Sequence, residues 1–257
     1  MRNRRTAIVL AFLVILGFPL RAQIPEKFEN LKVLPADITR PQLLQVMRGF
    51  ALGLGVRCQF CHVGEEGQPL STFDFKSDEK PTKRTARVML RMVHDINESY
   101  LSQLDTISPD HMAMSGDHDH ADHIEVQCAT CHRGNSRPQM MESVMTELVA
   151  DSGLPAAVTA YRELKRRYYG SYTFDFRERP LNSVAFDLLR KNRPEDALTI
   201  VNVNLELNPE AASVFQLQGD ANLALGRRDA AVASYRRALE LQPDNPPLKA
   251  RVDSLSH

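Results

Sequence analysis

The chain has 257 residues, of which 43% are hydrophobic and 25% are charged, with 12 glycines and 15 prolines. This is the composition of a globular protein, and it excludes wholesale disorder, a collagen-like chain and a multi-span membrane protein. Lysine and arginine total 32, and aspartate and glutamate also total 32, so net charge provides no general attraction to nucleic acid. We therefore expect one large or two modest domains and no nucleic-acid partner.

Residues 1–22 have the pattern of an export signal. A basic head that includes Arg4 and Arg5 precedes an apolar run over residues 6–20, and Ala22 precedes an expected cleavage point. The run is shorter than the ~20 apolar residues that cross a bilayer, which favours a cleaved signal peptide over an uncleaved membrane anchor. No cysteine follows the run, so we expect no lipid attachment there. In either case the rest of the chain is expected outside the cytoplasm, in the periplasm.

All four cysteines lie in C-x-x-C-H motifs, namely Cys58, Cys61 and His62 in the first and Cys128, Cys131 and His132 in the second. In an exported chain four cysteines would otherwise suggest two disulfides. The histidine after each pair instead favours two covalently bound haem c groups, in which both thiols add to the porphyrin vinyl groups and the histidine binds iron. Zinc is the competing metal, but structural zinc pairs lie much closer together in sequence than these motifs.

The second ligand of each iron decides the function, because an iron held by histidine and methionine exchanges electrons, whereas an open face activates peroxide or binds gas. Thr39 and Gln42 form a capping box, and apolar residues then recur at helical spacing as far as Leu54. Met47 lies on the apolar face of this predicted helix, before Cys58. It is the predicted ligand of the first iron, and the alternative is that Met47 only fills the core.

A second helix is predicted from about Thr82 to Leu104. Its apolar stripe consists of Met89, Met92, Val93, Ile96 and Tyr100. Spacing leaves both Met89 and Met92 open as the ligand of the second iron. The chain thus repeats the order of helix, loop and C-x-x-C-H.

These segments resemble the cytochrome c subunit of photosynthetic reaction centres. The likeness lies in LLQVMRGFALGLGVRCQFCH from Leu43, in ARVMLRMVHDINESY from Ala86, and in CATCHRG from Cys128, and it spans about Phe28 to Pro138. The resemblance implies that Met47 and Met89 are the axial ligands opposite His62 and His132. It also implies electron transfer between redox partners, as in a subunit that re-reduces a photo-oxidised donor.

The sequence departs from that family in three ways. Family members usually carry four haems, whereas this chain has one pair of motifs. In the four-haem proteins a histidine links the two haem pairs; its aligned place in this chain is near Gln103, so that histidine is absent here. This chain also has an additional C-terminal region. We therefore expect a di-haem module, whose redox donor and acceptor are a membrane reaction centre or another oxidoreductase complex.

The segment over residues 108–125 holds four of the eight histidines, several alternating with aspartate. A solvated insertion is the favoured interpretation. Surface binding of Zn, Cu or Ni is the alternative, and a smaller alternative is that His111 or His123 replaces a methionine on the second iron.

The region after Pro138 reads as helical, with two 34-residue repeats between Arg179 and Asp244. The second matches the tetratricopeptide pattern at Phe215, Gly219, Ala231, Tyr235, Ala238 and Pro243; the first matches it more loosely at Leu181, Ala185, Ala197, Val201, Asn204 and Pro209. Helices near Ala156–Tyr169 and Pro247–Leu255 are expected to complete the stack. The repeats offer either a docking surface for a protein partner or a packing platform for the haem domain.

The predicted fold is all-α, with a signal peptide over 1–22, a di-haem cytochrome c domain over 23–145 and a tetratricopeptide-like domain over 146–257. The favoured function is a di-haem electron carrier that is not an enzyme. The alternatives are a peroxidase-type di-haem enzyme and a repeat-based interaction protein with a haem redox sensor. A methionine before each motif counts against the open iron that a peroxidase requires.

Overall fold

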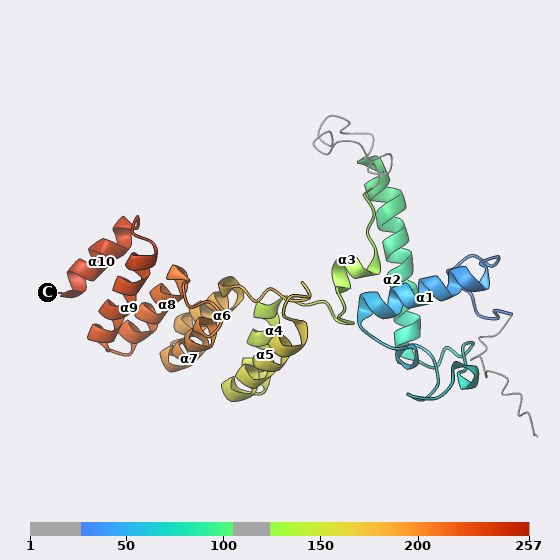
Figure 1. Ribbon diagram of the computed structural model, residues 1–257, viewed down its shortest axis with the longest axis horizontal. Coiled ribbons are helices and arrows are strands. Elements are labelled where there is room, and N and C mark those ends of the chain that lie inside the picture. Colours follow the sequence, from blue (N-terminus) through green and yellow to red (C-terminus); the bar gives the residue numbers. More distant parts are fainter. Residues whose placement is uncertain (1–26, 105–123, 257) are drawn as a thin grey trace, which may run out of the picture. The chain divides into compact units, whose positions relative to one another are not determined.

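The computed structural model describes residues 27–104 and 124–256, and within these ranges the chain is helical, without strands (Figure 1). The helices are α1 (Arg40–Leu54), α2 (Pro81–Asp95), α3 (Cys128–His132), α4 (Met141–Asp151), α5 (Leu154–Tyr168), α6 (Glu178–Arg190), α7 (Pro194–Leu205), α8 (Ala212–Ala224), α9 (Arg228–Leu241) and α10 (Pro246–Ser256). The all-α prediction is confirmed. The predicted signal peptide and almost all of the histidine-rich segment lie outside the described residues.

The described residues form two compact units. Residues 27–44 and 57–104 make up the first unit, and residues 45–56 and 124–256 make up the second. The first unit contains the first C-x-x-C-H motif and α2. The second contains most of α1, the second motif and helices α4 to α10. The functional division expected at residues 145 and 146 falls inside α4 and stays a prediction.

Both ends of α1 follow from local hydrogen bonding. The backbone N–H of Thr39 donates to Oε1 of Gln42 (3.0 Å), as expected for a capping box, and the helix begins at the next residue. At the other end, Gly55 has φ +66°, and the N–H groups of Gly55 and Val56 donate to carbonyl groups of the last turn. Glycine stops the helix here because it adopts this left-handed conformation without a steric penalty.

The predicted helix over residues 82–104 is present, but its α-helical part ends at Asp95. A π-helical turn over Ile96–Tyr100 and a 3-10 turn over Leu101–Gln103 follow. A π turn contains more residues than an α turn, so it rotates the following side chains away from the expected stripe. Accordingly Tyr100, predicted on the apolar stripe, is 68% exposed.

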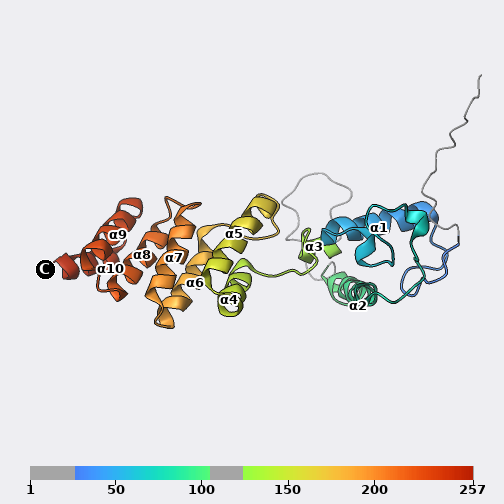
Figure 2. The same ribbon diagram turned by 90° about the horizontal axis from the view of Figure 1, so that it is seen from below.

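Helices α4 to α10 form a stack of antiparallel hairpins (Figures 1 and 2). Helices α6, α8 and α10 begin at intervals of 34 residues, and so do α7 and α9. The expected helices at Ala156–Tyr169 and Pro247–Leu255 correspond to α5 and α10. Helix α4, which was not predicted, pairs with α5 and completes a further hairpin.

The small residues of the repeats lie where helices approach one another. Ala185, Ala197 and Ala231 are completely buried. A Cβ atom on Gly219 would lie 2.2 Å from the ring of Tyr235, so only glycine fits there. Asn204, which departs from the repeat pattern, is also buried, and its amide donates to the carbonyl oxygen of Glu178 (2.8 Å). The departure is tolerated because the buried amide has hydrogen-bond partners.

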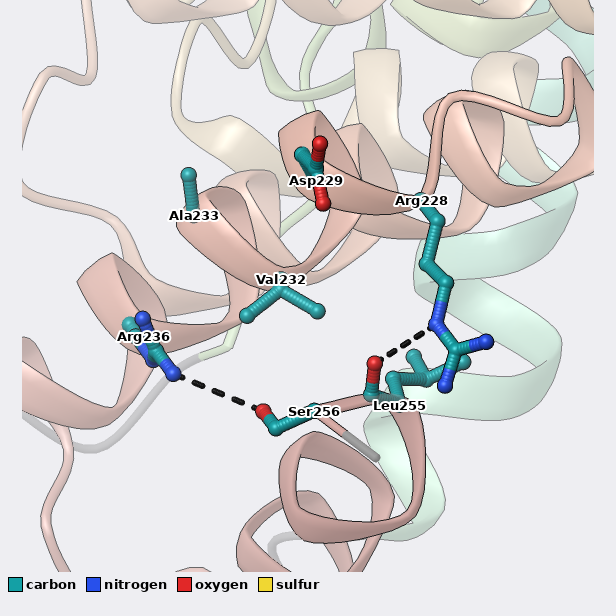
Figure 3. Close-up of a pocket in the computed structure, with 7 residues that line it drawn as sticks. All are labelled: Arg228, Asp229, Val232, Ala233, Arg236, Leu255 and Ser256. Atoms are coloured by element: carbon teal, nitrogen blue, oxygen red, sulfur yellow. Dashed lines mark hydrogen bonds between the residues drawn. The ribbon is translucent and has the colours of Figure 1, made fainter.

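The last helix, α10, is tied to α9 at the end of the stack. Arg228 Nε donates to the carbonyl oxygen of Leu255 (2.6 Å), and Arg236 donates to Oγ of Ser256 (3.4 Å), as Figure 3 shows. These side chains surround an open surface hollow of about 350 Å³. Leu248 and Val252 of α10 are buried in the same apolar cluster as Tyr235, so α10 covers the last hairpin, as a capping helix is expected to do.

Candidate haem-binding motifs

The first motif forms a single helical turn. Cys58–Phe60 is a 3-10 helix, and the N–H groups of Cys61 and His62 both donate to the carbonyl oxygen of Cys58, at 3.2 and 2.9 Å. In a turn of this kind, side chains three residues apart lie on the same side. The thiols of Cys58 and Cys61 are therefore placed to react with one planar group.

All four cysteines lie in the described part of the chain, and all four are free thiols. Burial raises the pKa of the Cys61 and Cys128 thiols above the ordinary value of 9.0. The disulfide interpretation of the motifs finds no support in this arrangement. Free thiol pairs are what covalent attachment of haem c requires.

His62 presents a neutral imidazole. Burial, assisted by the positive charges of Lys83 and Arg87, lowers the pKa of His62 from 6.5 to about 4. Its Nδ1 atom is buried and has no hydrogen-bond partner among the described residues. A metal-binding histidine must be unprotonated at the ligating nitrogen, so the protonation state of His62 fits iron binding at neutral pH.

The segment after the first motif is held by residues 73–75. The N–H of Asp74 donates to the carbonyl oxygen of Val63 (2.8 Å), forming an isolated β-bridge. A Cβ atom on Gly64 would lie 2.5 Å from the ring of Phe73, so glycine allows this close approach. The rings of His62 and Phe75 meet edge to face, with centroids 4.9 Å apart. The imidazole orientation thus depends on a neighbouring segment of the chain.

The second motif is the short helix α3. Thr130 Oγ1 accepts a hydrogen bond from the N–H of Gln127 (3.0 Å) at its start, and Arg133 ends it with φ +48°. Nδ1–H of His132 donates to the carbonyl oxygen of Asn135 (2.9 Å). This bond fixes the tautomer and leaves the Nε2 lone pair of His132 available to a metal.

The end of α1 packs directly on the second motif. The carbonyl oxygen of Gly53 accepts a hydrogen bond from the N–H of Gly134 (2.9 Å). A Cβ atom on Gly53 would lie 3.2 Å from the backbone nitrogen of Ala129, and one on Gly55 would lie 2.0 Å from the carbonyl oxygen of Gly134. Glycine is required here for backbone proximity as well as for helix termination.

The two predicted axial methionines occupy different units. Met47 is half-buried on α1 in the second unit, and Met89 is half-buried on α2 in the first. Met92, the alternative to Met89, is 41% exposed. The pairing of Met47 with His62 and of Met89 with His132 stays a prediction.

The first unit buries little apolar surface. Its buried hydrophobic side chains, among the described residues, are Leu43 and Phe73, whereas both apolar core clusters consist of residues from 141 onwards. Its exposed large apolar side chains are Phe60, Val88, Met92, Tyr100 and Leu104. These exposed apolar side chains are available to contact a large apolar group. The residues present therefore fit haem: the free thiols can attach it, the imidazoles of His62 and His132 can bind its iron, and the exposed apolar side chains can contact its ring.

Two features are absent from the described ranges 27–104 and 124–256, a cluster of metal-binding side chains and a membrane-spanning helix. No group of three or more histidine, cysteine, aspartate or glutamate side chains converges on a metal position there. No helix in this part of the chain is both long and apolar enough to cross a membrane. A zinc cluster within the described residues is thus not observed.

A polar network centred on Asp78 was missed by the sequence analysis. The Asp78 carboxylate pairs with Lys32 (2.6 Å) and Arg87 (2.8 Å), and it also accepts a hydrogen bond from the Asn30 amide (2.8 Å). Lys83 Nζ lies 3.5 Å from the same carboxylate. The network joins the start of the unit to α2. The only sequence signal was that Lys83 and Arg87 are four residues apart and so share a helix face.

The network predicts a specific dependence of stability on pH. Arg87 and Lys32 hold the pKa of Asp78 well below its ordinary value of 3.8. The ionised carboxylate therefore stabilises the folded state above about pH 4, and this contribution is lost as the pH falls further. In Asp78→Asn, we expect the free energy of unfolding to depend less on pH below about pH 4, as measured by urea unfolding followed by circular dichroism. Glu79→Gln, a surface change one residue away, should retain the wild-type acid dependence; equal slopes in all three proteins would contradict the prediction.

Comparison with known proteins gives matches over the N-terminal half. The family described as "Photosynthetic reaction centre cytochrome C subunit" matches residues 22–150. The chain is 32% identical to cytochrome c-554 of Chloroflexus aurantiacus over 131 residues, which cover 51% of this chain and 25% of that protein. It is 30% identical to the photosynthetic reaction center cytochrome c subunit of Thermochromatium tepidum over 93 residues, 36% of this chain and 20% of that protein. The chain thus spans about a quarter of the length of these relatives.

The search of solved structures also gives matches to tetratricopeptide repeat domains, at low sequence identity. The first such domain of human RPAP3 is 18% identical with a TM-score of 0.33, and the match covers 45% of this chain and 87% of that chain. The corresponding domain of Arabidopsis OM64 is 20% identical with a TM-score of 0.32, over 45% of this chain and 90% of that chain.

Proposed function

Because the chain belongs to the photosynthetic reaction centre cytochrome c subunit family, we propose that it is an exported di-haem c-type cytochrome that transfers electrons between redox partners. The observation that carries this proposal is the chemistry of the two motifs. Each has a pair of free thiols followed by a histidine, and the two histidines, His62 and His132, are each suited to bind iron. Export rests on the pattern of residues 1–22.

The residues divide into two equivalent sets. Cys58, Cys61, His62 and Met47 would hold the first haem; Cys128, Cys131, His132 and Met89 would hold the second. Haem iron bound by imidazole and thioether cycles between Fe(III) and Fe(II) and so passes single electrons. The cysteines prevent loss of the group, and the hydrogen bond from His132 to Asn135 keeps that imidazole oriented. Met47 and Met89 would stabilise Fe(II) relative to Fe(III), so their ligation would raise the reduction potential.

The partners follow from this role. We propose one redox protein as electron donor and another as acceptor, either a membrane reaction centre or another oxidoreductase complex. The genes next to this one distinguish these two outcomes. Genes for reaction-centre subunits would support the photosynthetic role, whereas genes for another oxidoreductase would indicate that this oxidoreductase is the partner.

A peroxidase-type enzyme is the main alternative, and peroxide consumption separates it from an electron carrier. If Met47 and Met89 both bind iron, the isolated protein should consume hydrogen peroxide only slowly. Met47→Ala, which opens one iron face, should consume peroxide faster than the unchanged protein. Rapid turnover by the unchanged protein would instead favour the enzyme.

The helical repeats support a second, independent role. Repeated helical hairpins form extended surfaces that bind peptides or proteins. In this chain the large apolar side chain of Phe186, on α6, is 53% exposed. We propose that a protein partner docks there. The test compares proteins retained from a periplasmic extract by the full chain and by a Phe186→Ser variant. A partner lost with Phe186→Ser supports docking, whereas identical retention favours a packing platform.

A further inference from the structure

The imidazole of His62 is oriented by an aromatic pair from the segment that follows the motif. The Phe75 ring meets the imidazole with planes at 68°, and Phe75 in turn stacks on the buried ring of Phe73 at 5.8 Å. A histidine ligand is normally oriented by a hydrogen bond from its second nitrogen, as in His132. His62 Nδ1 has no such bond among the described residues. The edge-to-face contact with Phe75 therefore constrains the orientation of the His62 imidazole.

Lys83 determines where Phe75 lies. Although charged, Lys83 is only 8% exposed, in the first turn of α2. Its ammonium group donates to the carbonyl oxygens of Phe75 and Ser77, each at 2.7 Å. A buried ammonium group is retained only where such partners compensate for the loss of water. These two hydrogen bonds hold the Lys83 ammonium group in place. Through its bond to the carbonyl oxygen of Phe75, Lys83 in turn restrains the backbone at Phe75.

The surroundings of Lys83 carry excess positive charge. Lys32, Lys83 and Arg87 share the carboxylate of Asp78. Asp74 adds a second negative charge near Lys83. Three cations thus face two carboxylates. Positive charge close to an iron ligand favours Fe(II), which carries one positive charge less than Fe(III).

We propose that Lys83 is a positioning residue for the first haem, which orients His62 through Phe75 and raises the reduction potential of that haem by its buried positive charge. The inference rests on the proposed function, because it requires a haem at the first motif. It assigns a role to a residue outside both C-x-x-C-H motifs.

The test is a spectroelectrochemical titration of the intact holoprotein with Lys83→Met, Lys83→Arg and Lys76→Met. A Cys128→Ala/Cys131→Ala variant, which retains only the first motif, identifies the titration wave of the first haem. In Lys83→Met we expect the ratio of reduced to oxidised first haem, at a fixed ambient potential, to fall about tenfold, which is about 59 mV for a one-electron couple. The second haem should not shift.

The controls separate position from charge alone. Lys83→Arg keeps the charge and the donors, so it should restore most of the potential. Lys76 belongs to the same loop but is exposed and pairs with Glu29, so Lys76→Met should change the potential little. An unchanged first haem in Lys83→Met, or an equal shift in Lys76→Met, would overturn the proposal.

A second variant keeps the proposal testable if Lys83→Met does not fold. Phe75→Leu leaves the backbone carbonyl bound to Lys83 but removes the ring that meets His62. The ferric electron paramagnetic resonance signal of the first haem should change its g-values, while that of the second stays constant; unchanged g-values would overturn the positioning role. A chain without covalent haem would give no signal and would contradict the proposed function itself. Two bound haems whose potentials and g-values do not change in the Lys83 and Phe75 variants would contradict only this inference.

Discussion

Met47→Ala is expected to remove about half of the weak methionine–iron absorption near the red end of the oxidised spectrum. If Met47 binds the first iron, alanine leaves that iron without its thioether, while the second keeps Met89. Loss of the thioether also disfavours Fe(II), so the potential of the first haem should fall, on the order of 0.1 V. Visible spectroscopy and a redox titration of the same sample measure both effects.

Met89→Ala and Met92→Ala provide the matched comparison on α2. Met89→Ala should remove the other half of the band, and the double variant with Met47→Ala should lack it completely. Met92→Ala should leave the band intact, since Met92 is 41% exposed and is not the methionine that the family resemblance implies. Loss of half of the band in Met92→Ala, with the band intact in Met89→Ala, would show that Met92 is the ligand instead of Met89. An intact band in Met47→Ala would show that Met47 does not bind iron.

Gly219→Leu is expected to lower the free energy of unfolding of the repeats by about 3 kcal/mol. Even a Cβ atom at this position would lie 2.2 Å from the Tyr235 ring. That ring cannot move aside easily, because Tyr235 is completely buried and its hydroxyl donates to Asp220 (2.7 Å). Helices α8 and α9 must therefore separate. Urea unfolding followed by circular dichroism measures the change.

Ala224→Leu is the control for this substitution. It adds a similar side chain to the same helix, but at an exposed position. Its free energy of unfolding should stay within about 0.5 kcal/mol of the wild type. If both leucine variants unfold alike, the close contact between Gly219 and Tyr235 does not limit packing.

Much of the fold could be predicted because its signals are local. The Thr39–Gln42 box and the 34-residue spacing of the repeats are both signals of this kind, and the structure confirms both. The π turn after Asp95 has no comparable sequence signal, so the regular helix was predicted too long. The prediction of a His and Met pair at each iron rests on family resemblance, because helical spacing alone does not distinguish an iron ligand from a core methionine.

The network around the first motif could not be predicted, because it depends on contacts between distant segments. Lys32 and Asp78 are 46 residues apart in sequence. Lys83 looks like an ordinary charge at the start of a helix, and only the path of residues 73–78 buries it. The approach of Gly53 to Gly134 likewise follows from tertiary packing, although both glycines were visible in the sequence.

Intact-mass measurement tests the central claim most directly. The chain is expressed in a host with a working cytochrome c maturation system, and the denatured polypeptide is weighed. We predict the mass of the mature chain plus two haem groups, and a Cys58→Ala/Cys61→Ala variant should retain one of them. A denatured polypeptide that carries no added haem, although a known c-type cytochrome matures in the same cells, would contradict the account.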